Sequence, residues 1–366
     1  MSFFFNLPLS ESFINFIRSM RARHPFYRSA VIFLMAILTG ASVFSQEVSF
    51  FYINPSAGSV YLAGEMNNWS PTATPMQRDV AGQWSVTLNL APGQYLYKFV
   101  VDGNYINDPD PNALFSSDGR GGVHSYRLVG EGNFQYHLGI PHGTVVSYNF
   151  QSAFLITGID VNVYLPPAPL TDSLPILILL HGSGMDKQQW TDNGLIANYM
   201  DNLLAKGIIR PFIIAMPSYM PFSTSEDLPG FMAWDLPGFL KTNFNASNHP
   251  KKSALGGMSR GGWVTLWVGE NNPSNFGLLI PISSSVPLGA KEKKDLVNLK
   301  RSGKILLYCG TEDALLVNNE SLATFLNAQG IPFQYFKSPG GHTWQYWNSI
   351  TPDFLKRASD FFYSQR

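Results

Sequence analysis

The chain carries Gly257-Met258-Ser259-Arg260-Gly261 between a short apolar run, Ala254–Gly256, and a helix-like stretch that begins at Arg260. A Gly-x-Ser-x-Gly sequence between a strand and a helix is typical of a nucleophile elbow, a turn so sharp that the serine hydroxyl stands exposed. The glycines keep side chains out of that crowded turn. A serine that caps a helix after a glycine turn is the alternative, and the flanking strand and helix favour Ser259 as a nucleophile.

The two partners that such a serine needs follow it in the sequence. A serine hydroxyl is a weak nucleophile until a histidine, held by an acid, removes its proton. Asp313 ends the stretch Gly310-Thr311-Glu312-Asp313 after an apolar run, with Glu312 as the rival acid, and His342 follows two glycines after the last apolar run. The chain order Ser, Asp, His is that of the α/β-hydrolases. We therefore predict a catalytic triad of Ser259, Asp313 and His342.

A glycine-containing loop supplies the remaining part of such a site. His181-Gly182-Ser183-Gly184 follows the apolar run Ile176–Leu180. We expect the backbone N–H groups of Ser183 and Arg260 to form the oxyanion hole, which holds the negative charge that develops on a carbonyl oxygen. The side chain of His181 is expected to shape the loop.

The second half of the chain alternates apolar runs with amphipathic stretches. This rhythm predicts an α/β-hydrolase fold, a mostly parallel sheet with helices on both faces. The strands are expected at Ile176–Leu180, Phe212–Met216, Ala254–Gly256, Leu278–Ile282, Ile305–Cys309 and Phe333–Phe336. The helices are expected at Leu195–Ala205, Arg260–Gly269, Ser321–Ala328 and Asp353–Phe362.

The stretch from Val48 to about Val129 has a different pattern. Short runs such as Val60–Ala63, Gln83–Leu88 and Gln94–Val101 alternate with turn signals such as Asp102-Gly103. Short strands at this spacing predict an immunoglobulin-like β-sandwich. We therefore divide the chain into residues 1–45, a sandwich at 48–129 and a hydrolase domain at 140–366.

Composition limits the classes of function. Hydrophobic residues make up 45% of the 366 residues, and Lys+Arg 25 balance Asp+Glu 25. The hydrophobic fraction predicts a large core. The balance of charges predicts no basic face for nucleic acid. We find no metal-ligand spacing and expect no metal or organic cofactor. The single cysteine, Cys309, lies in an apolar run and is expected to be a buried free thiol.

Residues 1–45 have the layout of a secretory signal peptide. Four arginines precede the apolar run Ala30–Val43, which is short for a membrane span. Met20 is an alternative start, and an uncleaved membrane anchor is the alternative interpretation. The layout predicts a secreted or periplasmic protein with no membrane contact beyond this signal.

Four motifs resemble one family. Leu179–Gly184, Gly256–Gly262, Cys309–Asp313 and Gly340–Trp344 together resemble the esterase D group of α/β-hydrolases, over about residues 140–366. That group includes bacterial feruloyl, acetyl-xylan and siderophore esterases. Arg260 departs from the methionine usual there, and its guanidinium is available for an anionic substrate or a structural carboxylate. Three further aromatic residues are candidates for an aryl pocket or for the core: Trp190, Trp344 and Tyr346.

The N-terminal half resembles a second family. Gly64–Ser70, Tyr95–Gly103 and Asn107–Pro109 resemble the glycogen-binding type of early-set sandwich modules, found in glycogen-branching enzymes and the AMP-activated kinase β subunit. The resemblance implies a sugar-binding face formed by Trp69, Lys98 and Tyr105, with Tyr105 in place of a tryptophan. Many such modules are only structural partners of a catalytic domain.

Together these features predict a serine esterase that removes feruloyl groups from a polysaccharide such as xylan. The substrate partner would be a polysaccharide or oligosaccharide ester. An acetyl-xylan esterase, a siderophore-ester hydrolase and a non-catalytic glycan-binding protein are the alternatives. The acyl group, the glycan and the oligomeric state stay open at this point.

Overall fold

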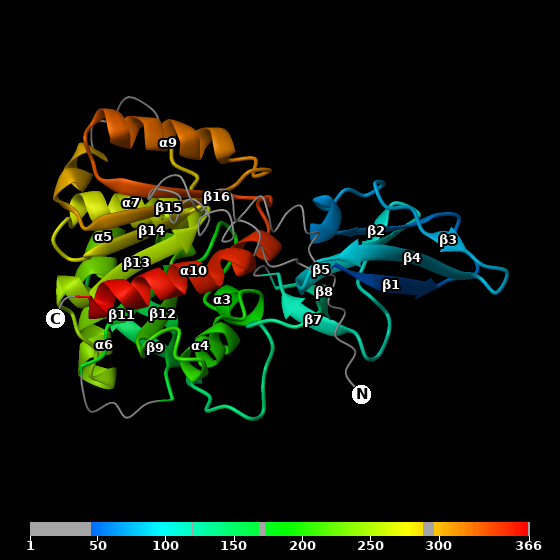
Figure 1. Cartoon of the computed structure of the whole chain (residues 1–366), viewed down its shortest axis with the longest axis horizontal. Helices are drawn as coiled ribbons and strands as arrows, with labels where there is room; N and C mark the ends of the chain where they lie inside the picture. Colours follow the sequence, from blue (N-terminus) through cyan, green and yellow to red (C-terminus); the bar gives the residue numbers. More distant parts are fainter. Residues whose placement is uncertain (1–44, 119–120, 168–172, 288–295, 365–366) are drawn as a thin grey trace, which may run out of the picture. The chain divides into compact units, whose positions relative to one another are not determined.

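An eight-stranded sheet organises the second half of the chain (Figure 1). The computed structural model describes residues 45–118, 121–167, 173–287 and 296–364, so the predicted signal segment lies outside the described residues except for Ser45. The strand order is β16-β15-β14-β13-β11-β12-β10-β9. The strands are β9 Thr144–Ser152, β10 Thr157–Leu165, β11 Ile176–Leu180, β12 Ile213–Pro217, β13 Ser253–Met258, β14 Leu278–Ile282, β15 Lys304–Gly310 and β16 Phe333–Ser338.

The sheet is parallel except at one edge, where β10 pairs antiparallel with both β12 and β9. The α-helices are α3 Gln189–Asp192, α4 Ile196–Ala205, α5 Leu228–Gly230, α6 Leu236–Phe244, α7 Arg260–Asn271, α9 Leu316–Ala328 and α10 Trp344–Tyr363. The remaining turns are the 3₁₀-helices η2 Met220–Phe222, η4 Pro250–Lys252 and η5 Leu296–Arg301 and the π-helix η3 Phe231–Asp235.

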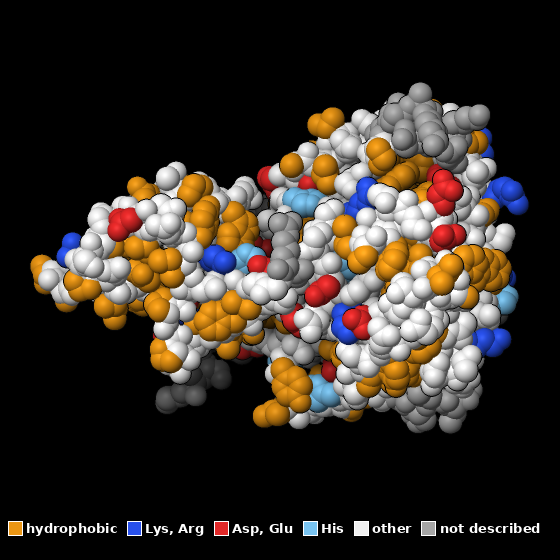
Figure 2. Space-filling view, turned by 180° about the vertical axis from the view of Figure 1, so that it is seen from behind, with side chains coloured by type: hydrophobic (Ala, Val, Ile, Leu, Met, Phe, Trp, Pro, Cys, Tyr) orange, Lys and Arg blue, Asp and Glu red, His pale blue; other side chains and the backbone are white. Residues whose placement is uncertain are grey.

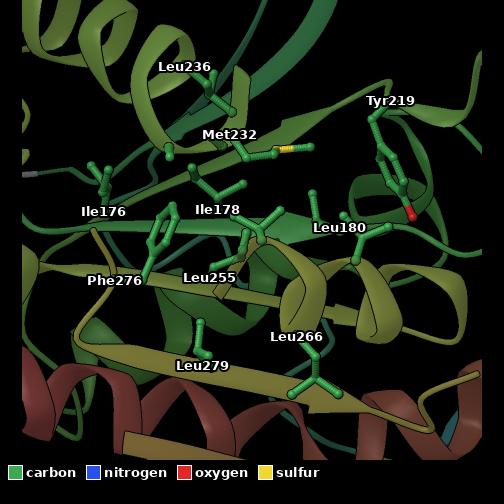
Figure 3. Close-up of a cluster of buried hydrophobic side chains, with 14 of the residues drawn as sticks. Ile176, Ile178, Leu180, Tyr219, Met232, Leu236, Leu255, Leu266, Phe276 and Leu279 are labelled. Carbon is green, nitrogen blue, oxygen red and sulfur yellow. The ribbon is translucent and has the colours of Figure 1, made fainter. Parts of the chain in front are cut away.

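Both faces of the sheet are buried, because successive side chains of a strand point to opposite faces. Ile176, Ile178 and Leu180 of β11 pack in one cluster with side chains of α6, α7 and α9, part of which is drawn in Figure 3. Leu177 and Leu179 pack in another cluster with side chains of α4 and α10. The prediction of a mostly parallel sheet with helices on both faces is confirmed.

The last helix differs from its prediction. We expected it at Asp353–Phe362, which leaves Pro352 outside the helix. Helix α10 instead begins at Trp344 and contains Pro352 in its interior. Trp344, Trp347 and Ile350 of the first turns are buried in the core beside the sheet. This packing outweighs the local cost of the proline, since tertiary burial supplies most of a helix's stability.

The N-terminal strands form two sheets over a shared core. One sheet has the order β1-β4-β3, and the other has the order β2-β5-β8-β7 with β6 paired to β5. The strands are β1 Gln46–Ile53, β2 Val60–Gly64, β3 Gln77–Arg78, β4 Gln83–Leu90, β5 Gly93–Val101, β6 Asn104–Ile106, β7 Leu114–Ser117 and β8 Val123–Val129, with the 3₁₀-helix η1 Glu65–Asn67 after β2. Phe50, Tyr97 and Phe99 lie in the core between the sheets.

This sandwich and the large sheet belong to one compact unit that starts at Ser45. On the face shown in Figure 2, charged side chains of both signs are scattered among apolar and neutral ones. None of the helices in the described ranges has the length and hydropathy that a membrane crossing needs. Cys309 is a buried free thiol.

Candidate active site

Ser259 lies in a strained turn between β13 and α7. Its backbone has φ 54° and ψ −116°, a conformation that residues other than glycine rarely adopt. The N–H of Ser259 donates to the carbonyl of Ile282 at 2.9 Å, and the carbonyl of Ser259 accepts from Ser285 at 3.1 Å. The neighbouring strand therefore holds the turn on both sides, in the strand–turn–helix context that a nucleophile elbow requires.

The two glycines of the elbow are required by close backbone packing. A Cβ on Gly257 would lie 2.7 Å from the Cβ of Leu180 and 2.8 Å from the carbonyl carbon of Gly261. A Cβ on Gly261 would lie 2.6 Å from the carbonyl oxygen of His181. No side chain fits at either position unless the backbone shifts.

Asp313 and His342 form a hydrogen-bonded pair beyond the carboxyl ends of β15 and β16. The Nδ1 of His342 lies 3.1 and 3.0 Å from the two carboxylate oxygens of Asp313. The Asp313 side chain is fully buried, whereas that of His342 is 31% exposed. Such a bond fixes the orientation of the imidazole and leaves its Nε2 for a second partner.

The environment of Asp313 favours its ionised form. Burial by itself would raise the pKa of this carboxyl, but the hydrogen bond and charge of His342 outweigh it and hold the pKa below its usual value, with further bonds from Ser283 and the backbone N–H of Leu315. Ser283 Oγ also accepts from the indole N–H of Trp347 at 3.2 Å. The sequence analysis missed Ser283 and Trp347, because their roles depend on tertiary contacts.

The rival acid Glu312 has a different position. Its carboxylate is exposed and accepts from the hydroxyl of Thr311 and the backbone N–H of Gly340. Glu312 therefore supports the backbone of the loop that carries His342, and Asp313 is the acid that contacts the imidazole.

Ser259 and His342 line the same cavity, which has a volume of about 380 Å³. Volumes of this size are typical of small-ligand sites. The lining residues come from the elbow, the loops after β11 and β16, helices α3 and α10, and the sandwich: Glu65, Trp69, Leu96, Asp118, His124, Gly182, Ser183, Met185, Gln189, Asn193, Ser259, His342, Thr343, Trp344 and Trp347.

The residues predicted for the oxyanion hole flank Ser259. Gly182 and Ser183 line the cavity, and a Cβ on Gly182 would lie 3.5 Å from the Cβ of Ser259. Arg260 is the first residue of α7, where a backbone N–H has no partner within the helix. The guanidinium of Arg260 donates to the carbonyl of Ser223 at 2.9 Å. That side chain thus contacts the loop that follows β12.

His181 packs as a core residue beside the site. It is 1% exposed, and its Nδ1–H donates to the carbonyl of Gly182 at 2.9 Å. Burial lowers the pKa of His181 to about 4, so the imidazole is neutral at neutral pH. The backbone carbonyl of His181 accepts from the hydroxyl of Tyr219 at 2.7 Å. These contacts fix the loop that carries Gly182 and Ser183.

The three candidate aromatic residues divide between cavity and core. Trp344 lines the cavity, whereas Trp190 and Tyr346 are buried beneath it and are absent from its lining. The indole N–H of Trp190 donates to the carbonyl of Leu180 at 3.0 Å. Trp190 therefore supports the strand that leads to the oxyanion loop.

The sandwich contributes one wall of the cavity. Trp69, Leu96 and His124 all line it, and the rings of Trp69 and His124 lie 4.7 Å apart. Of the residues predicted for a sugar face, Trp69 therefore lies in the cavity. The hydroxyl of Tyr105 donates to the carbonyl of Trp69 at 3.1 Å.

Lys98 lies beside this wall. Tyr97 pairs with Ser125, so Lys98 lies across from His124 on the face of the sheet opposite to the sandwich core. The charge of Lys98 adds to burial in lowering the pKa of His124. His124 and Leu96 were not predicted as site residues. The packing of the sandwich against the hydrolase domain cannot be read from the local sequence pattern of either domain.

Within the described residues, no group of three or more His, Cys, Asp or Glu side chains is placed to hold a metal ion.

A serine, an aspartate and a histidine in this chain order, at the carboxyl edge of a parallel sheet, define an α/β-hydrolase. The family model described as "Putative esterase" matches residues 152–356, more than half of the chain. The chain belongs to this esterase family. A second model, described as "Glycogen recognition site of AMP-activated protein kinase", matches residues 50–135.

Individual relatives agree with these two matches. An endo-1,4-beta-xylanase/feruloyl esterase of Xylanibacter ruminicola is 25% identical over 284 residues, which is 73% of this chain and 38% of that protein. An acetyl esterase of Caldicellulosiruptor saccharolyticus is 25% identical over 241 residues, 52% of this chain and 86% of that protein. The chain spans only 38% and 54% of the length of two of its curated relatives.

A solved structure matches most of the chain. The enterobactin esterase of Shigella flexneri superposes with a TM-score of 0.66 and 17% identity, and the match covers 85% of this chain and 92% of that one. At this level of identity the likeness concerns the fold.

We predict that Gly261→Ala destabilises the protein. The new Cβ would meet backbone oxygens at 2.6 and 2.7 Å, so the elbow must shift, at a cost of about 1–3 kcal/mol in the free energy of unfolding. Gly238→Ala is the control, because this position in α6 has open space around its Cβ and alanine is about 1 kcal/mol better than glycine in a helix. Urea unfolding measures both variants, and equal effects would contradict the packing argument.

Glu65 on the cavity wall leads to a pH prediction. Burial raises its pKa from 4.5 to about 7, although backbone N–H groups of Leu96, Gln345 and Trp344 act to lower it. A carboxyl whose pKa is raised on folding contributes its full stabilisation at pH values below its pKa in the unfolded chain. This contribution is lost as the pH rises through its pKa in the folded protein. The stability of the wild type relative to Glu65→Gln should therefore fall between about pH 4.5 and pH 7, by at most about 1.4 kcal/mol per pH unit.

Urea unfolding of both proteins across this pH range measures the difference. Glu312→Gln is the control, because hydrogen bonds from Thr311 and Gly340 hold the pKa of Glu312 below its usual value. Its contribution should change only in more acidic solution. A difference between wild type and Glu65→Gln that stays constant with pH would show that the carboxyl has an ordinary pKa.

Proposed function

We propose that the protein is an exported serine carboxylic-ester hydrolase that removes feruloyl groups from a plant polysaccharide such as xylan. The observation that carries the proposal is the cavity shared by Ser259 and His342, with aromatic side chains of the sandwich in its wall. The family match and the feruloyl esterase relative support ester hydrolysis.

The reaction follows from the roles of three residues. Ser259 Oγ attacks the ester carbonyl while His342 takes the hydroxyl proton, and Asp313 stabilises the imidazolium that forms. The backbone N–H groups of Ser183 and Arg260 hold the oxyanion. The sugar alcohol leaves with the proton from His342, and water then releases the acid from the acyl-enzyme.

The lining of the cavity favours an aromatic acyl group over an acetyl group. Trp69, Trp344 and Trp347 supply ring faces and edges, and Leu96 and Met185 add apolar surface. An aryl group gains packing and ring–ring contacts there that an acetyl group is too small to make. Deacetylation, the activity that names the Caldicellulosiruptor relative, is the second candidate.

A siderophore ester is the third candidate, supported by the fold likeness to the enterobactin esterase over 85% of the chain. Anionic substrates need cationic partners, and none of the lining residues that the structure describes is lysine or arginine. The guanidinium of Arg260 contacts a protein carbonyl instead. This lining favours a neutral aryl ester.

The position of the sugar is part of the proposal. Lys98 and Tyr105 lie next to cavity residues of the sandwich, since Lys98 is across from His124 and Tyr105 contacts Trp69. We propose that a glycan lies along this surface, with lysine bonding hydroxyls and Tyr105 stacking, while its acyl group enters the cavity. We also propose that the sandwich has an immunoglobulin-like fold. Residues 1–45 are proposed to direct the export of the protein.

Ester hydrolysis by purified protein tests the function. We expect hydrolysis of methyl ferulate and of p-nitrophenyl acetate, with kcat/KM at least about a thousandfold lower in Ser259→Ala for both substrates. Activity on the acetate alone would move the proposal to acetyl groups. Inactivity on both, together with binding to insoluble xylan that Trp69→Ala abolishes, would favour a non-catalytic glycan-binding protein.

Trp69→Ala tests the contribution of the sandwich to substrate recognition. Loss of one aromatic contact, worth about 1 kcal/mol, should raise the KM for a feruloylated xylo-oligosaccharide about fivefold. The KM for p-nitrophenyl acetate should change less. Trp234→Ala is the matched control, because Trp234 is 59% exposed and does not line the cavity. Equal effects of the two variants would place the aromatic contact elsewhere.

A further inference from the structure

A buried carboxylate of the sandwich contacts the helix that follows the catalytic loop. Glu65 lies in η1 and is 5% exposed. Its Oε2 accepts from the backbone N–H of Leu96 at 3.0 Å, and its Oε1 accepts from the backbone N–H of Gln345 at 3.3 Å. Residues 65 and 345 are 280 positions apart in the chain. The carboxylate therefore joins the sandwich to the first turn of α10.

The first turn of a helix has N–H groups without helical partners. In α10 the hydroxyl of Thr343 accepts from Tyr346 at 3.4 Å, while Glu65 accepts from Gln345 and also faces the N–H of Trp344. A carboxylate at this end of a helix is also favoured by the helix dipole. The first turn of α10 is thus capped by one side chain of the hydrolase domain, Thr343, and by one side chain of the sandwich, Glu65.

The start of α10 holds the chain on the C-terminal side of His342, as Glu312 and Asp313 hold the loop and the imidazole from the other side. Only Thr343 separates His342 from the helix, and Gly340 and Gly341 precede it, so the loop itself has little intrinsic rigidity. The sandwich makes two further contacts here. Gln345 Nε2 donates to the hydroxyl of Tyr95 at 2.8 Å, and Asn68 Oδ1 lies 3.3 Å from where a Cβ of Gly341 would be.

We propose that Glu65 is a positioning residue for catalysis: it anchors the first turn of α10 and so holds His342 at the distance from Ser259 that proton transfer requires. This inference rests on the proposed function of the triad. It gives the sandwich a role in the chemical step itself, in addition to any binding of sugar. The role must therefore be visible with an ester that carries no sugar, since such an ester gains nothing from a glycan-binding surface.

The test compares the full-length wild type with Glu65→Ala, Glu65→Gln and Tyr97→Phe. Tyr97→Phe removes a buried hydrogen bond to Asp108, and the Tyr97 ring lies in the core between the two sheets of the sandwich, so this variant controls for destabilisation of the sandwich. Three quantities are measured: hydrogen exchange of residues 339–350, the rate at which a fluorophosphonate modifies Ser259, and kcat and KM for p-nitrophenyl acetate.

We expect Glu65→Ala to speed exchange at residues 339–350 and to slow both serine modification and kcat at least tenfold, with KM changed less than threefold. Glu65→Gln keeps one carbonyl oxygen as an acceptor and should recover part of the rate. Tyr97→Phe should keep the wild-type rates even where it lowers the Tm equally.

Two results would overturn the assignment of Glu65. Faster exchange without a slower reaction would show that Glu65 caps the helix but does not position His342. Equal rate losses in Glu65→Ala and Tyr97→Phe would show a general effect of sandwich stability. A wild type that neither reacts with the fluorophosphonate nor cleaves the ester would instead overturn the proposed triad, and this inference with it.

Discussion

The close packing of the first turn of α7 against the ends of β13 and β11 is the constraint on which the site depends. It requires glycine at positions 257 and 261 and forces Ser259 to a positive φ. Backbone strain of this kind persists only where the surrounding structure enforces it. Here the enforcement comes from the neighbouring strand, since the N–H of Ser259 donates to Ile282. The same sheet edge then presents Asp313 and His342 from loops that follow the next strands, because parallel strands end at a common edge.

The cavity that Ser259 and His342 line is not formed by the hydrolase domain alone. Trp69, Leu96 and His124 form one wall, and Glu65 contacts the helix that begins two residues after His342. A glycan-binding module that acts at a distance from the catalytic centre would need none of these contacts. In this account the sandwich shapes the acyl site, leads the glycan toward it, and supports the geometry of the base.

The predicted triad could be proposed from the sequence because each of its members lies within a few residues of the end of an apolar run, a local pattern that also locates the strand ends. Contacts between distant parts of the chain could not be predicted from the sequence. Glu65 looks like an ordinary surface acid in a turn, and nothing near it in sequence shows that it meets Gln345. The predicted helix Asp353–Phe362 lacked the first turns of α10, because the burial of Trp347 that stabilises those turns is not visible in the local sequence. Trp69 was predicted on a sugar-binding face, and its place in the cavity wall could not be predicted, because the face of the sandwich that meets the hydrolase domain is a property of tertiary packing.

One cavity joins the serine of the hydrolase domain to the aromatic wall of the sandwich. A crystal structure of Ser259→Ala with a bound feruloylated xylo-oligosaccharide tests it most directly. We expect the feruloyl ring against Trp69, the ester carbonyl beside the N–H groups of Ser183 and Arg260, and the sugar toward Lys98 and Tyr105. A feruloyl ring bound away from the sandwich, with Trp69 free of contact, would contradict it.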